Sequence, residues 1–490
     1  MTDLAKMDKS SEDAIAVPEA PYKRDEEMQE LSSKERTSSF FTILASAFGL
    51  ISDGYQNNLM TMANVVFTNL YPEYYTSEVK TRVSNSLLVG AVLGQVIVGV
   101  ICDRLGRKFA LVGTTIMIVV GGILGTAAHG AHGSVAGLFW FLTIARGITG
   151  VGVGGEYPAS STSASEAANE RMPSQRGPVF IMVTNFVLSF GGPLAVAVFL
   201  IVLSAAGEDH LPTVWRVCFG IGVLLPLTVF YFRVRMLTTK LYRDSAIKHR
   251  VPYMLSLKRY WKSLIGTCGA WFLYDFVTFP NGVFSGTIIS SVVHDSDIKR
   301  TAEWQLLLGT IALPGVFAGA FLCNRLGRRN TMMLGFSGYL VFGLIIGCAY
   351  EKITNIIPLF IIFYGLMQSF GNMGPGDMLG LVSAESYPTP IRGTFYGLSA
   401  AIGKVGAAVG TQAFTPIQDN LGKKWTFIIA AICGVTGIVV TYLFVPDMTG
   451  VDLRDEDAAF MKYLSENGWE GEVGEKEGVD SEDDFEAMKK

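Results

Sequence analysis

Charged side chains are scarce in this sequence, and the patterns of several function classes are missing. Only 17% of the 490 residues are charged and 50% are hydrophobic, a balance that excludes an ordinary soluble domain. No metal-ligand spacing, catalytic triad or basic nucleic-acid patch stands out in the sequence. We therefore expect a protein that is not an enzyme and has no cofactor, no bound metal and no nucleic-acid partner.

Cysteine is also sparse. The six cysteines fall in or beside apolar segments, so we expect small packing residues rather than a disulfide framework or a metal site. The first 38 residues are polar and mixed in charge. Because they contain no apolar core, we expect no cleavable signal segment there.

What the sequence does have is a series of long apolar runs. Roughly 20 apolar residues cross the hydrocarbon core of a bilayer, and lipid offers no partners to backbone N–H and C=O groups, so each run should be a helix. We therefore predict an all-α polytopic membrane protein with twelve spans in the lipid bilayer. The spans lie near 39–66, 83–102, 109–129, 135–158, 178–205, 214–234, 262–290, 304–323, 331–350, 355–384, 393–414 and 425–445.

Basic residues gather in the connections on one side of the predicted membrane. The connection from Arg233 to Lys262 holds nine bases and one acid, whereas the connections on the other side lack such an excess. By the positive-inside rule, both termini should lie in the cytoplasm. The predicted organisation is a disordered cytoplasmic N-terminal tail at 1–38, a six-helix bundle at 39–234, a basic cytoplasmic linker at 235–261, a second six-helix bundle at 262–446 and an acidic cytoplasmic tail at 447–490.

The C-terminal stretch from Asp447 to Lys490 contains 15 acids and five bases. Acidic segments with few aromatic and apolar residues are typical of solvated, disordered chain. We expect this tail to lack a packed structure and to be either regulatory or simply solvated.

The two predicted bundles repeat a short charged motif. Asp-Arg-Leu-Gly-Arg-Lys follows the second span at 103–108, and Asn-Arg-Leu-Gly-Arg-Arg follows the eighth span at 324–329. One such loop can be a topology signal alone, but two copies at matching places indicate two related bundles around a central path. Acids and Arg-Gly pairs also recur after the fourth and tenth spans: Glu166 with Arg176 and Gly177, and Glu385 with Arg392 and Gly393. We expect a role in conformational gating for Asp103, Arg104, Gly106, Arg107, Arg325 and Arg328.

These motifs, together with the run Arg-Gly-Ile-Thr-Gly-Val-Gly-Val-Gly-Gly-Glu-Tyr-Pro at 146–158, resemble the signatures of the major facilitator superfamily. Three segments are similar to its proton-coupled phosphate symporters: Gly-Gly-Glu-Tyr-Pro at 154–158, Trp-Phe-Leu-Tyr-Asp at 271–275 and Gly-Lys-Val-Gly-Ala at 403–407. The segments 52–65 and 374–380 resemble the fungal permeases for glycerophosphoinositol and glycerophosphocholine. The resemblance covers nearly all of residues 40–450 and implies two bundles that alternate between outward-open and inward-open states.

Several charged residues lie inside predicted spans, where a charge costs about 2.5–3.5 kcal/mol on insertion scales. They should therefore face a cavity or a partner. The glycines before Glu156 let another helix approach closely, because they have no Cβ; a packing seam with Glu156 at the water interface is the alternative. We expect Arg146 to pair with Asp53 or Glu156. The expected proton-coupling set is Asp53, Glu156, Asp275 and Arg146. A structural hydrogen bond between helices is the alternative for Asp53, and a fixed structural ion pair is the alternative for Arg146.

The same resemblance implies how a phosphate would be held. Tyr157 and Trp271 would donate hydrogen bonds to it, and Lys404 would be its positive partner unless its ammonium extends to a membrane interface instead. Asn185 is either a substrate-binding amide or a hydrogen bond between helices. The expected substrate-binding set is Tyr157, Asn185, Trp271, Asp275, Phe279, Asn281, Asn372, Asp377, Lys404 and Gln56.

Four positions depart from the phosphate symporters that the sequence resembles. Those proteins usually have a second acid at Gln56, an Asp at Glu156, a Tyr at Phe279 and an Asn at Gly376. Because Phe279 cannot donate a hydrogen bond, the loss suits an esterified phosphate with an additional polar head, for which Asp377 would supply a contact. Pro280 and Asn281 predict a break in the seventh span at the cavity.

We therefore predict a carrier that imports a glycerophosphodiester together with protons across the plasma membrane. Its partners would be a small anionic organophosphate, protons and the lipid bilayer, and we expect it to work as a monomer. The sequence fits glycerophosphoinositol and glycerophosphocholine equally well. Two alternatives remain: an inorganic phosphate symporter, against which Phe279 and Gly376 argue, and a nutrient sensor that binds without transporting and signals through its acidic tail.

Overall fold

A computed structural model describes residues 33–235, 240–247, 251–293, 297–471 and 473. The chain divides into a short unit, Met1–Thr37, and a large one, Ser38–Lys490. Its described residues form helices and turns without a β-strand, as predicted. Residues 33–38 of the predicted disordered N-terminal tail are helical instead, because they form the start of α1. Residues 1–32 of that tail and residues 474–490 of the acidic tail lie outside the described residues.

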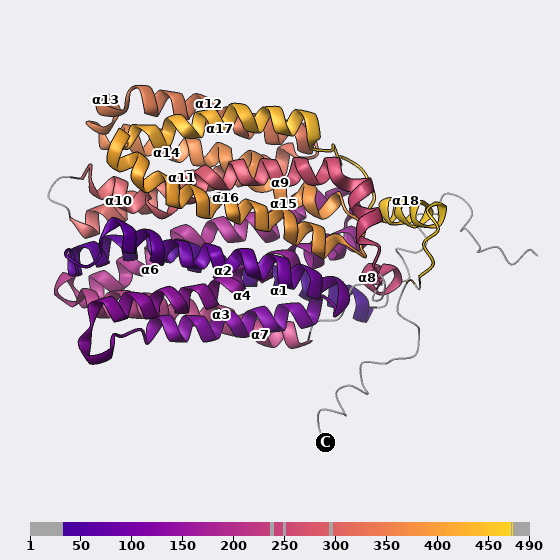
Figure 1. Ribbon diagram of the computed structural model, residues 1–490, viewed down its shortest axis with the longest axis horizontal. Helices are drawn as coiled ribbons and strands as arrows, with labels where there is room; N and C mark the ends of the chain where they lie inside the picture. The colour runs from indigo at the N-terminus through magenta and orange to yellow at the C-terminus, as the bar shows by residue number, and fades with distance from the viewer. Residues whose placement is uncertain (1–32, 236–239, 248–250, 294–296, 472, 474–490) are drawn as a thin grey trace, which may run out of the picture. The chain divides into compact units, whose positions relative to one another are not determined.

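The first half of the large unit contains six helical spans, which Figure 1 shows together in indigo to magenta. The fifth of them is continuous through a π-helical turn, η4 (Met182–Phe186). Such turns are rare and occur mostly at functional sites. The six spans are α1 (Ser33–Leu70), α2 (Ser77–Arg104), α3 (Arg107–Thr126), α4 (Val135–Arg171), α5 (Arg176–Ile181) with η4 and α6 (Val187–Ala206), and α7 (Leu211–Arg235).

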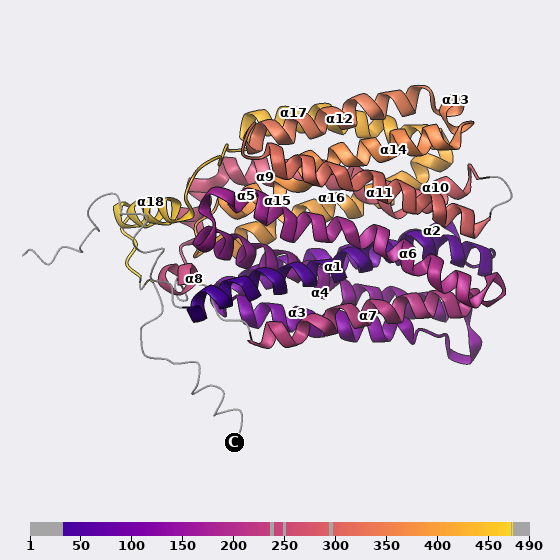
Figure 2. The same cartoon turned by 180° about the vertical axis from the view of Figure 1, so that it is seen from behind.

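The second half repeats this arrangement, and Figure 2 shows its helices from behind. Its fourth span also contains a π-helical turn, η7 (Asn372–Gly376). The spans are α9 (Tyr253–Val283) followed by α10 (Ser285–Ser290), α11 (Ile298–Leu322), α12 (Arg328–Cys348), α14 (Ile357–Gly371) with η7 and α15 (Asp377–Glu385), α16 (Arg392–Leu421) and α17 (Lys424–Phe444). Short helices lie in the linker, between α12 and α14, and after α17: α8 (Lys240–Ser245), α13 (Tyr350–Thr354) and α18 (Leu453–Glu466).

Eight of these segments are long and apolar enough to cross a membrane, by length and composition, among the described residues. The other four predicted spans correspond to α1, α9, α14 with α15, and α16. These four are the ones that carry Asp53, Asp275, Asp377 and Lys404. Charged side chains within apolar spans belong at an interior between helices rather than at a lipid face.

The glycine run before Glu156 forms the tight contact that its sequence predicts. A Cβ on Gly150 would lie 2.2 Å from the carbonyl oxygen of Leu87, and one on Gly154 would lie 2.2 Å from that of Ala91. Helices α2 and α4 therefore pack backbone to backbone, which fixes the position of the next turn of α4, where Glu156 and Tyr157 lie.

The break in the seventh span lies slightly beyond its predicted position. Helix α9 continues through Pro280 and Asn281 to Val283, and Phe284 separates it from α10. Asn281 stays inside α9, where its side-chain amide donates to the carbonyl of Val277 at 2.8 Å.

The two halves touch at both ends of the helices. We call the end that carries the connections 172–175, 323–327 and 386–391 the basic end. At the opposite end, the Thr81 and Thr415 hydroxyls lie 2.9 Å apart, and Asn85 donates to the carbonyl of Ala408 at 3.1 Å, so α2 is bonded to α16. Side-chain networks described below join the halves at the basic end.

Helix α18 contradicts the expectation of an unpacked acidic tail for residues 453–466. Its residues Leu453, Phe460 and Leu464 are buried, because their helical spacing places them on one apolar face. Phe460 and Leu464 belong to a hydrophobic cluster with Tyr260 of α9 and Tyr387 at the basic end. The acidic residues of α18 thus border a packed contact.

Candidate functional site

A cavity of about 220 Å³ lies between the two halves of the large unit. Its walls come from α1, α4, η4 and α6 on one side and from α9, α11, η7, α15 and α16 on the other. Eight of the ten predicted substrate-binding residues line it: Tyr157, Asn185, Trp271, Asp275, Phe279, Asn372, Asp377 and Lys404. The lining residues also include Asn57, Asn58, Gln305 and Gln368.

The other two predicted binding residues contact their own surroundings instead. Gln56 is buried and donates to the carbonyl of Gly222 in α7 at 3.1 Å. Asn281 is held by the α9 backbone, as described above. Neither is among the residues that line the cavity.

Lys404 is the positive centre of the cavity among its described lining residues. Its ammonium lies 2.8 Å from Oδ2 of Asp275, and the side chain is nearly fully buried. The same nitrogen lies 3.9 Å from the centre of the Phe279 ring and 5.3 Å from that of Tyr157. Lys404 therefore does not extend to an end of its helix: it forms a buried ion pair enclosed by aromatic faces.

The aromatic wall beside this pair is fixed by contacts between the halves. Trp271 packs edge-on against Tyr396, with ring centres 5.6 Å apart. The Tyr396 hydroxyl and that of Ser161 in α4 are 2.9 Å apart. A Cβ on Gly403 would lie 2.4 Å from the Trp271 indole, so that glycine leaves space for the ring one residue before Lys404.

A second polar group lies elsewhere on the cavity wall. The amide of Asn185 in η4 donates to Oδ1 of Asp377 at 2.6 Å, which joins the first half to the second. Oδ2 of Asp377 is buried without a hydrogen-bond partner among the described residues. Asn372 in η7 donates to the carbonyl of Ala312 at 3.0 Å. The two π-helical turns thus place amides and a carboxylate at the cavity.

The predicted proton-coupling residues in the first half have partners that differ from those expected. Glu156 is fully buried and forms an ion pair with Arg233 near the end of α7. Arg146 instead donates to the carbonyl of Val83 at 3.3 Å. Asp53 is also fully buried, and neither of its carboxylate oxygens has a hydrogen-bond partner among the described residues.

Sequence reasoning missed Arg233 because it was counted with the basic connection that follows. The signal was present in the spacing of α7. Gly222, Pro226, Val229 and Arg233 recur at helical intervals, and all four are buried. An arginine on the inward face of an apolar helix predicts a buried carboxylate partner.

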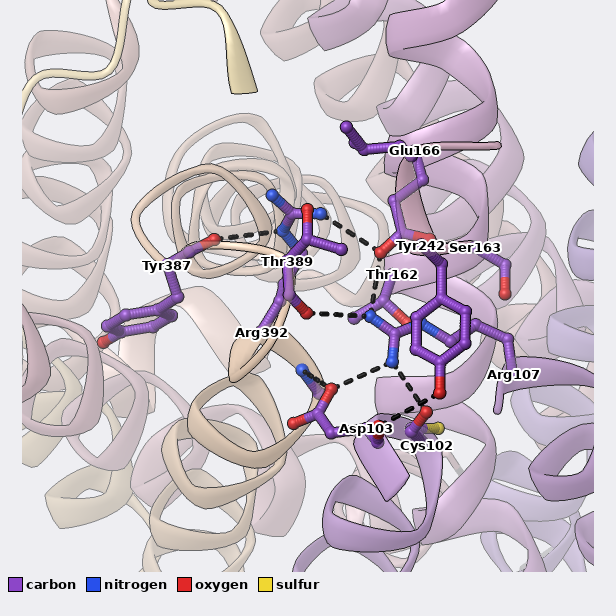
Figure 3. A network of polar contacts seen from close by, with 12 residues as sticks. Cys102, Asp103, Arg107, Thr162, Ser163, Glu166, Tyr242, Tyr387, Thr389 and Arg392 are labelled. Carbon is purple, nitrogen blue, oxygen red and sulfur yellow. Dashed lines mark hydrogen bonds and ion pairs between the residues drawn. The ribbon is translucent and has the colours of Figure 1, made fainter. Parts of the chain in front are cut away.

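At the basic end, the motif after α2 forms a charged network that joins the halves (Figure 3). Arg107 lies 2.9 Å from Asp103 and 2.8 Å from Glu166, and Glu166 also pairs with Arg392 at 3.1 Å. We call these four residues the first network. Asp103 accepts from the backbone N–H groups of Gly393 and Thr394, at 2.9 and 2.6 Å, in the first turn of α16. A carboxylate there is favoured by the positive end of the helix dipole.

The motif after α11 forms a matching network. Arg328 pairs with Glu385 at 3.1 Å, Arg176 pairs with the same carboxylate at 2.7 Å, and Asn324 accepts from Arg328 at 2.8 Å. We call these four residues the second network. Glu166, Arg176, Glu385 and Arg392 were recognised as a repeat in the sequence without being assigned to gating. The recurrence of a Glu and an Arg after the fourth and tenth spans was the signal that could have assigned these residues to gating.

The remaining motif residues lie outside these networks. Arg104 and Arg325 are exposed, and the guanidinium of Arg325 lies 3.8 Å above the ring of Phe321. Gly106 has a φ of +97°, a conformation that side chains rarely adopt, so it forms the turn between α2 and α3 as expected.

The linker helix α8 covers the first network. The ring of Tyr242 lies 4.4 Å from the Arg107 guanidinium, and its hydroxyl donates to the backbone carbonyl of Asp103 at 3.0 Å. Figure 3 shows Tyr242 next to Arg107. No feature of the sequence singled out Tyr242 in advance.

Comparison with known proteins identifies the family of this chain and proteins of similar structure. The profile of the family described as sugar (and other) transporter matches residues 39–460. Glycerophosphoinositol permease 1 of Candida albicans is 55% identical, covering 95% of this chain and 89% of the relative. Glycerophosphoinositol transporter 1 of Saccharomyces cerevisiae is 53% identical, covering 91% of this chain and 86% of the relative. Among solved structures, the proton:xylose symporter XylE bound to 6-bromo-6-deoxy-D-glucose has a TM-score of 0.72 at 16% identity, covering 87% of this chain and 99% of that one.

Proposed function

Because this chain belongs to the family of sugar and other transporters, a family of major facilitator carriers, we propose that it imports glycerophosphoinositol together with protons across the plasma membrane. The observation that carries the proposal is the buried ammonium of Lys404, paired with Asp275 in a cavity between the two halves. The two relatives above, at 55% and 53% identity, are both named for glycerophosphoinositol, which favours this head group over choline.

The charges of the cavity suit a phosphodiester. A phosphodiester carries one negative charge, and Lys404 supplies one positive charge that Asp275 neutralises when no substrate is bound. Substrate would share the ammonium with Asp275 rather than replace that carboxylate, since a buried charge left without its partner is costly. Phe279 places an aromatic face rather than a donor beside Lys404, which is compatible with an esterified oxygen.

The polyol head has its own set of groups. Asn185, Asn372, Asp377 and Gln368 line the cavity together with Asn57 and Asn58, and amides and carboxylates are the partners that hydroxyls require when buried. Oδ2 of Asp377 has no hydrogen-bond partner among the described residues, so it can accept from a hydroxyl of the head. A choline head has no hydroxyl to donate to it.

Transport would follow by rocking of the two halves about this cavity. Hydrogen bonds between α2 and α16 join the halves at one end, and the two networks join them at the basic end. Each set would break in turn to expose the cavity to one side. We place the basic end and both termini in the cytoplasm, because the basic connections gather there.

The proposal is tested by measuring the uptake of labelled glycerophosphoinositol. The cells express this protein and have no uptake system for that substrate of their own. We expect Lys404→Met to reduce uptake about 10- to 100-fold, since a hydrogen bond to a charged group contributes about 1.5–3 kcal/mol. Lys299→Met, at an exposed position in α11, is the matched control and should leave uptake unchanged. An uncoupler should abolish accumulation in the wild type.

Competition and reconstitution separate the alternatives. Unlabelled glycerophosphoinositol should compete better than glycerophosphocholine or inorganic phosphate, and stronger competition by phosphate would contradict the proposed substrate. Liposomes that contain the purified protein should accumulate substrate when an inward proton gradient is applied. Binding without accumulation would overturn transport and favour a sensor.

A further inference from the structure

Tyr396 of α16 lies at the end of the cavity that faces the basic end. It follows Arg392 of the first network by one helical turn and precedes Lys404 by two turns. Its side chain is buried and lines the cavity. Tyr396 is therefore the residue of α16 that separates the cavity from the charged network.

The contacts of Tyr396 close the cavity across both halves. Its hydroxyl lies 2.9 Å from that of Ser161 in α4, which belongs to the other half. A Cβ on Gly380 of α15 would lie 3.2 Å from the Tyr396 hydroxyl oxygen and 3.5 Å from the ring of Phe180 in α5. Phe180 is buried and lines the cavity as well. Two aromatic rings, one from each half, thus lie against Gly380 and form the floor of the cavity.

A polar stripe continues along α4 from this floor to the basic end. Its members recur every four residues and so share one face of the helix: Tyr157, Ser161, Ser165 and Asn169. Tyr157 and Ser161 line the cavity, and Asn169 accepts from Arg176 of the second network at 2.7 Å. Ser165 lies between these contacts, beyond the floor.

Two hydroxyls beyond the floor are buried without a partner. Ser165 and Ser383 are both fully buried, and neither hydroxyl has a hydrogen-bond partner among the described residues. Ser383 lies about one turn after Gly380 in α15, just as Ser165 lies one turn after Ser161 in α4. An unpaired buried hydroxyl is unfavourable. These two groups therefore gain a partner when water or a substrate hydroxyl reaches them.

Resting on the proposed transport function, we propose that Tyr396 and Phe180 form an inner gate. Ser165 and Ser383 line the path by which a substrate with a polyhydroxylated head leaves the cavity for the cytoplasm. When the halves part at the basic end, the bond between Tyr396 and Ser161 breaks, because its two partners belong to different halves. The two serines then pair with water or with hydroxyls of the substrate.

The test measures thiol labelling at position 165 from the cytoplasmic face. Inside-out membrane vesicles that contain Ser165→Cys are treated with a membrane-impermeant maleimide, and mass spectrometry of the peptide around residue 165 gives the labelling rate. Adding Tyr396→Phe should raise this rate roughly two- to tenfold, the range for the loss of one hydrogen bond. Adding Ser161→Ala removes the same bond and should raise it as much, and both changes together should add nothing further.

Two matched controls show that the labelling reports the gate. Ser163→Cys lies on another face of α4, where Ser163 donates to the carbonyl of Ala159 at 2.7 Å, and should stay unlabelled. Tyr339→Phe removes a buried hydroxyl of the cavity wall whose partner, Thr278, belongs to the same half. It should therefore leave labelling at position 165 unchanged. Thermal unfolding confirms that each variant is folded.

Removing the unpartnered hydroxyls tests the path itself. Ser165→Ala and Ser383→Ala each remove a group that is unpaired while the gate is closed and paired when it opens, so each favours the closed gate. The maximal rate of glycerophosphoinositol uptake should fall roughly two- to tenfold. Binding of glycerophosphoinositol to the purified protein should keep its affinity, because neither serine is among the described residues that line the cavity.

The inference fails if Ser165→Cys is not labelled from the cytoplasmic face, or if Tyr396→Phe and Ser161→Ala leave its labelling rate unchanged. It also fails if Ser165→Ala and Ser383→Ala weaken binding or leave the maximal rate of uptake as it is. Labelling requires no substrate. A protein that shows the expected labelling but takes up no glycerophosphoinositol would overturn the proposed substrate, which is a separate failure.

Discussion

The first and second networks occupy matching positions in the two halves, yet they differ in charge. The first contains two carboxylates, Asp103 and Glu166, for its two arginines. In the second, a neutral amide replaces one acid, and Glu385 alone holds Arg328 and Arg176. A repeat in the sequence therefore does not imply equal strength in the structure.

The replaced residue has a different neighbour in each half. Asp103 accepts three hydrogen bonds from the start of α16, including one from the Thr394 hydroxyl at 2.7 Å. Asn324 instead donates to the carbonyl of Ser174 at 3.3 Å, just before α5. The first network thus joins the halves through a carboxylate at a helix start, and the second does so mainly through Glu385.

The segment that leads to α18 supplies part of what the second network lacks. The carbonyl of Val451 accepts from Arg176 at 2.8 Å, and the Thr449 hydroxyl accepts from the backbone N–H of Arg328 at 3.2 Å. The C-terminal segment therefore adds acceptors where the second half has one carboxylate fewer. These contacts add to the apolar contact of α18 with the rest of the protein.

The largest expected effect comes from removing one carboxylate of each network in turn, Glu385 of the second and Glu166 of the first. Glu385→Gln leaves two buried guanidinium groups with no carboxylate in their network, and breaking a buried pair costs about 3–5 kcal/mol. Glu166→Gln leaves Asp103 in place and should cost less. Thermal unfolding of the purified protein in detergent measures both.

The order of the two melting temperatures shows whether the two networks differ in their contribution to stability. Glu385→Gln should melt at the lower temperature, and Glu351→Gln, at an exposed position in α13, should match the wild type. An equal loss from both network variants would mean that the missing acid of the second network has no energetic consequence.

A smaller effect, on uptake, should follow from substituting Asp103 and Asn324, the residues at which the two motifs differ in charge. Asp103→Asn removes the ion pair to Arg107 and weakens the bonds to α16, so we expect roughly tenfold slower uptake, as for the loss of one charged hydrogen bond. Asn324→Asp should change uptake by less than about threefold, because Arg328 can pair with the new carboxylate. Uptake normalised to the amount of protein at the cell surface provides the measurement.

The double variant tests whether the two motifs are interchangeable. Asp103→Asn combined with Asn324→Asp keeps the total charge but places the acid where it meets the Ser174 carbonyl rather than the first turn of α16. Uptake should therefore remain as slow as in Asp103→Asn alone. Recovery to the wild-type rate would contradict the difference between the networks.

The sequence predicted the helical class, the twelve spans and eight residues of the cavity wall, because buried polar residues in apolar helices carry a clear signal. Tyr157, Trp271, Asp275 and Lys404 line one cavity as expected. Their exact pairing was only partly predictable. The register between α4 and α7, which brings Arg233 rather than Arg146 to Glu156, depends on packing of residues far apart in the chain.

Helix α18 was missed for a different reason. Composition averages over a whole segment, and the acids of 447–490 outweighed three apolar residues at helical spacing, Leu453, Phe460 and Leu464. A periodicity count over residues 453–466 alone would have predicted an amphipathic helix. What it packs against lies in the second half and could not be predicted from local sequence.

The smallest effect concerns Tyr242, which covers the first network from the linker. Tyr242→Leu removes both the ring above Arg107 and the hydrogen bond to the Asp103 carbonyl, and Tyr242→Phe removes only the hydrogen bond. A cation–π contact contributes about 0.5–2 kcal/mol, so the leucine variant should open the network several-fold more often and the phenylalanine variant less. Hydrogen exchange of the backbone at 101–107, followed by mass spectrometry, reports this opening.

Tyr442→Leu is the matched control, because its exposed ring lies 5.8 Å from Arg329 of the second motif. A contact at that distance and exposure should contribute little, so exchange at 324–329 should stay as in the wild type. If Tyr242→Leu likewise leaves exchange at 101–107 unchanged, the linker merely lies over the first network. If exchange rises at 101–107 and not at 324–329, the linker stabilises the first network alone. The two halves then differ in the contacts that stabilise their networks as well as in charge.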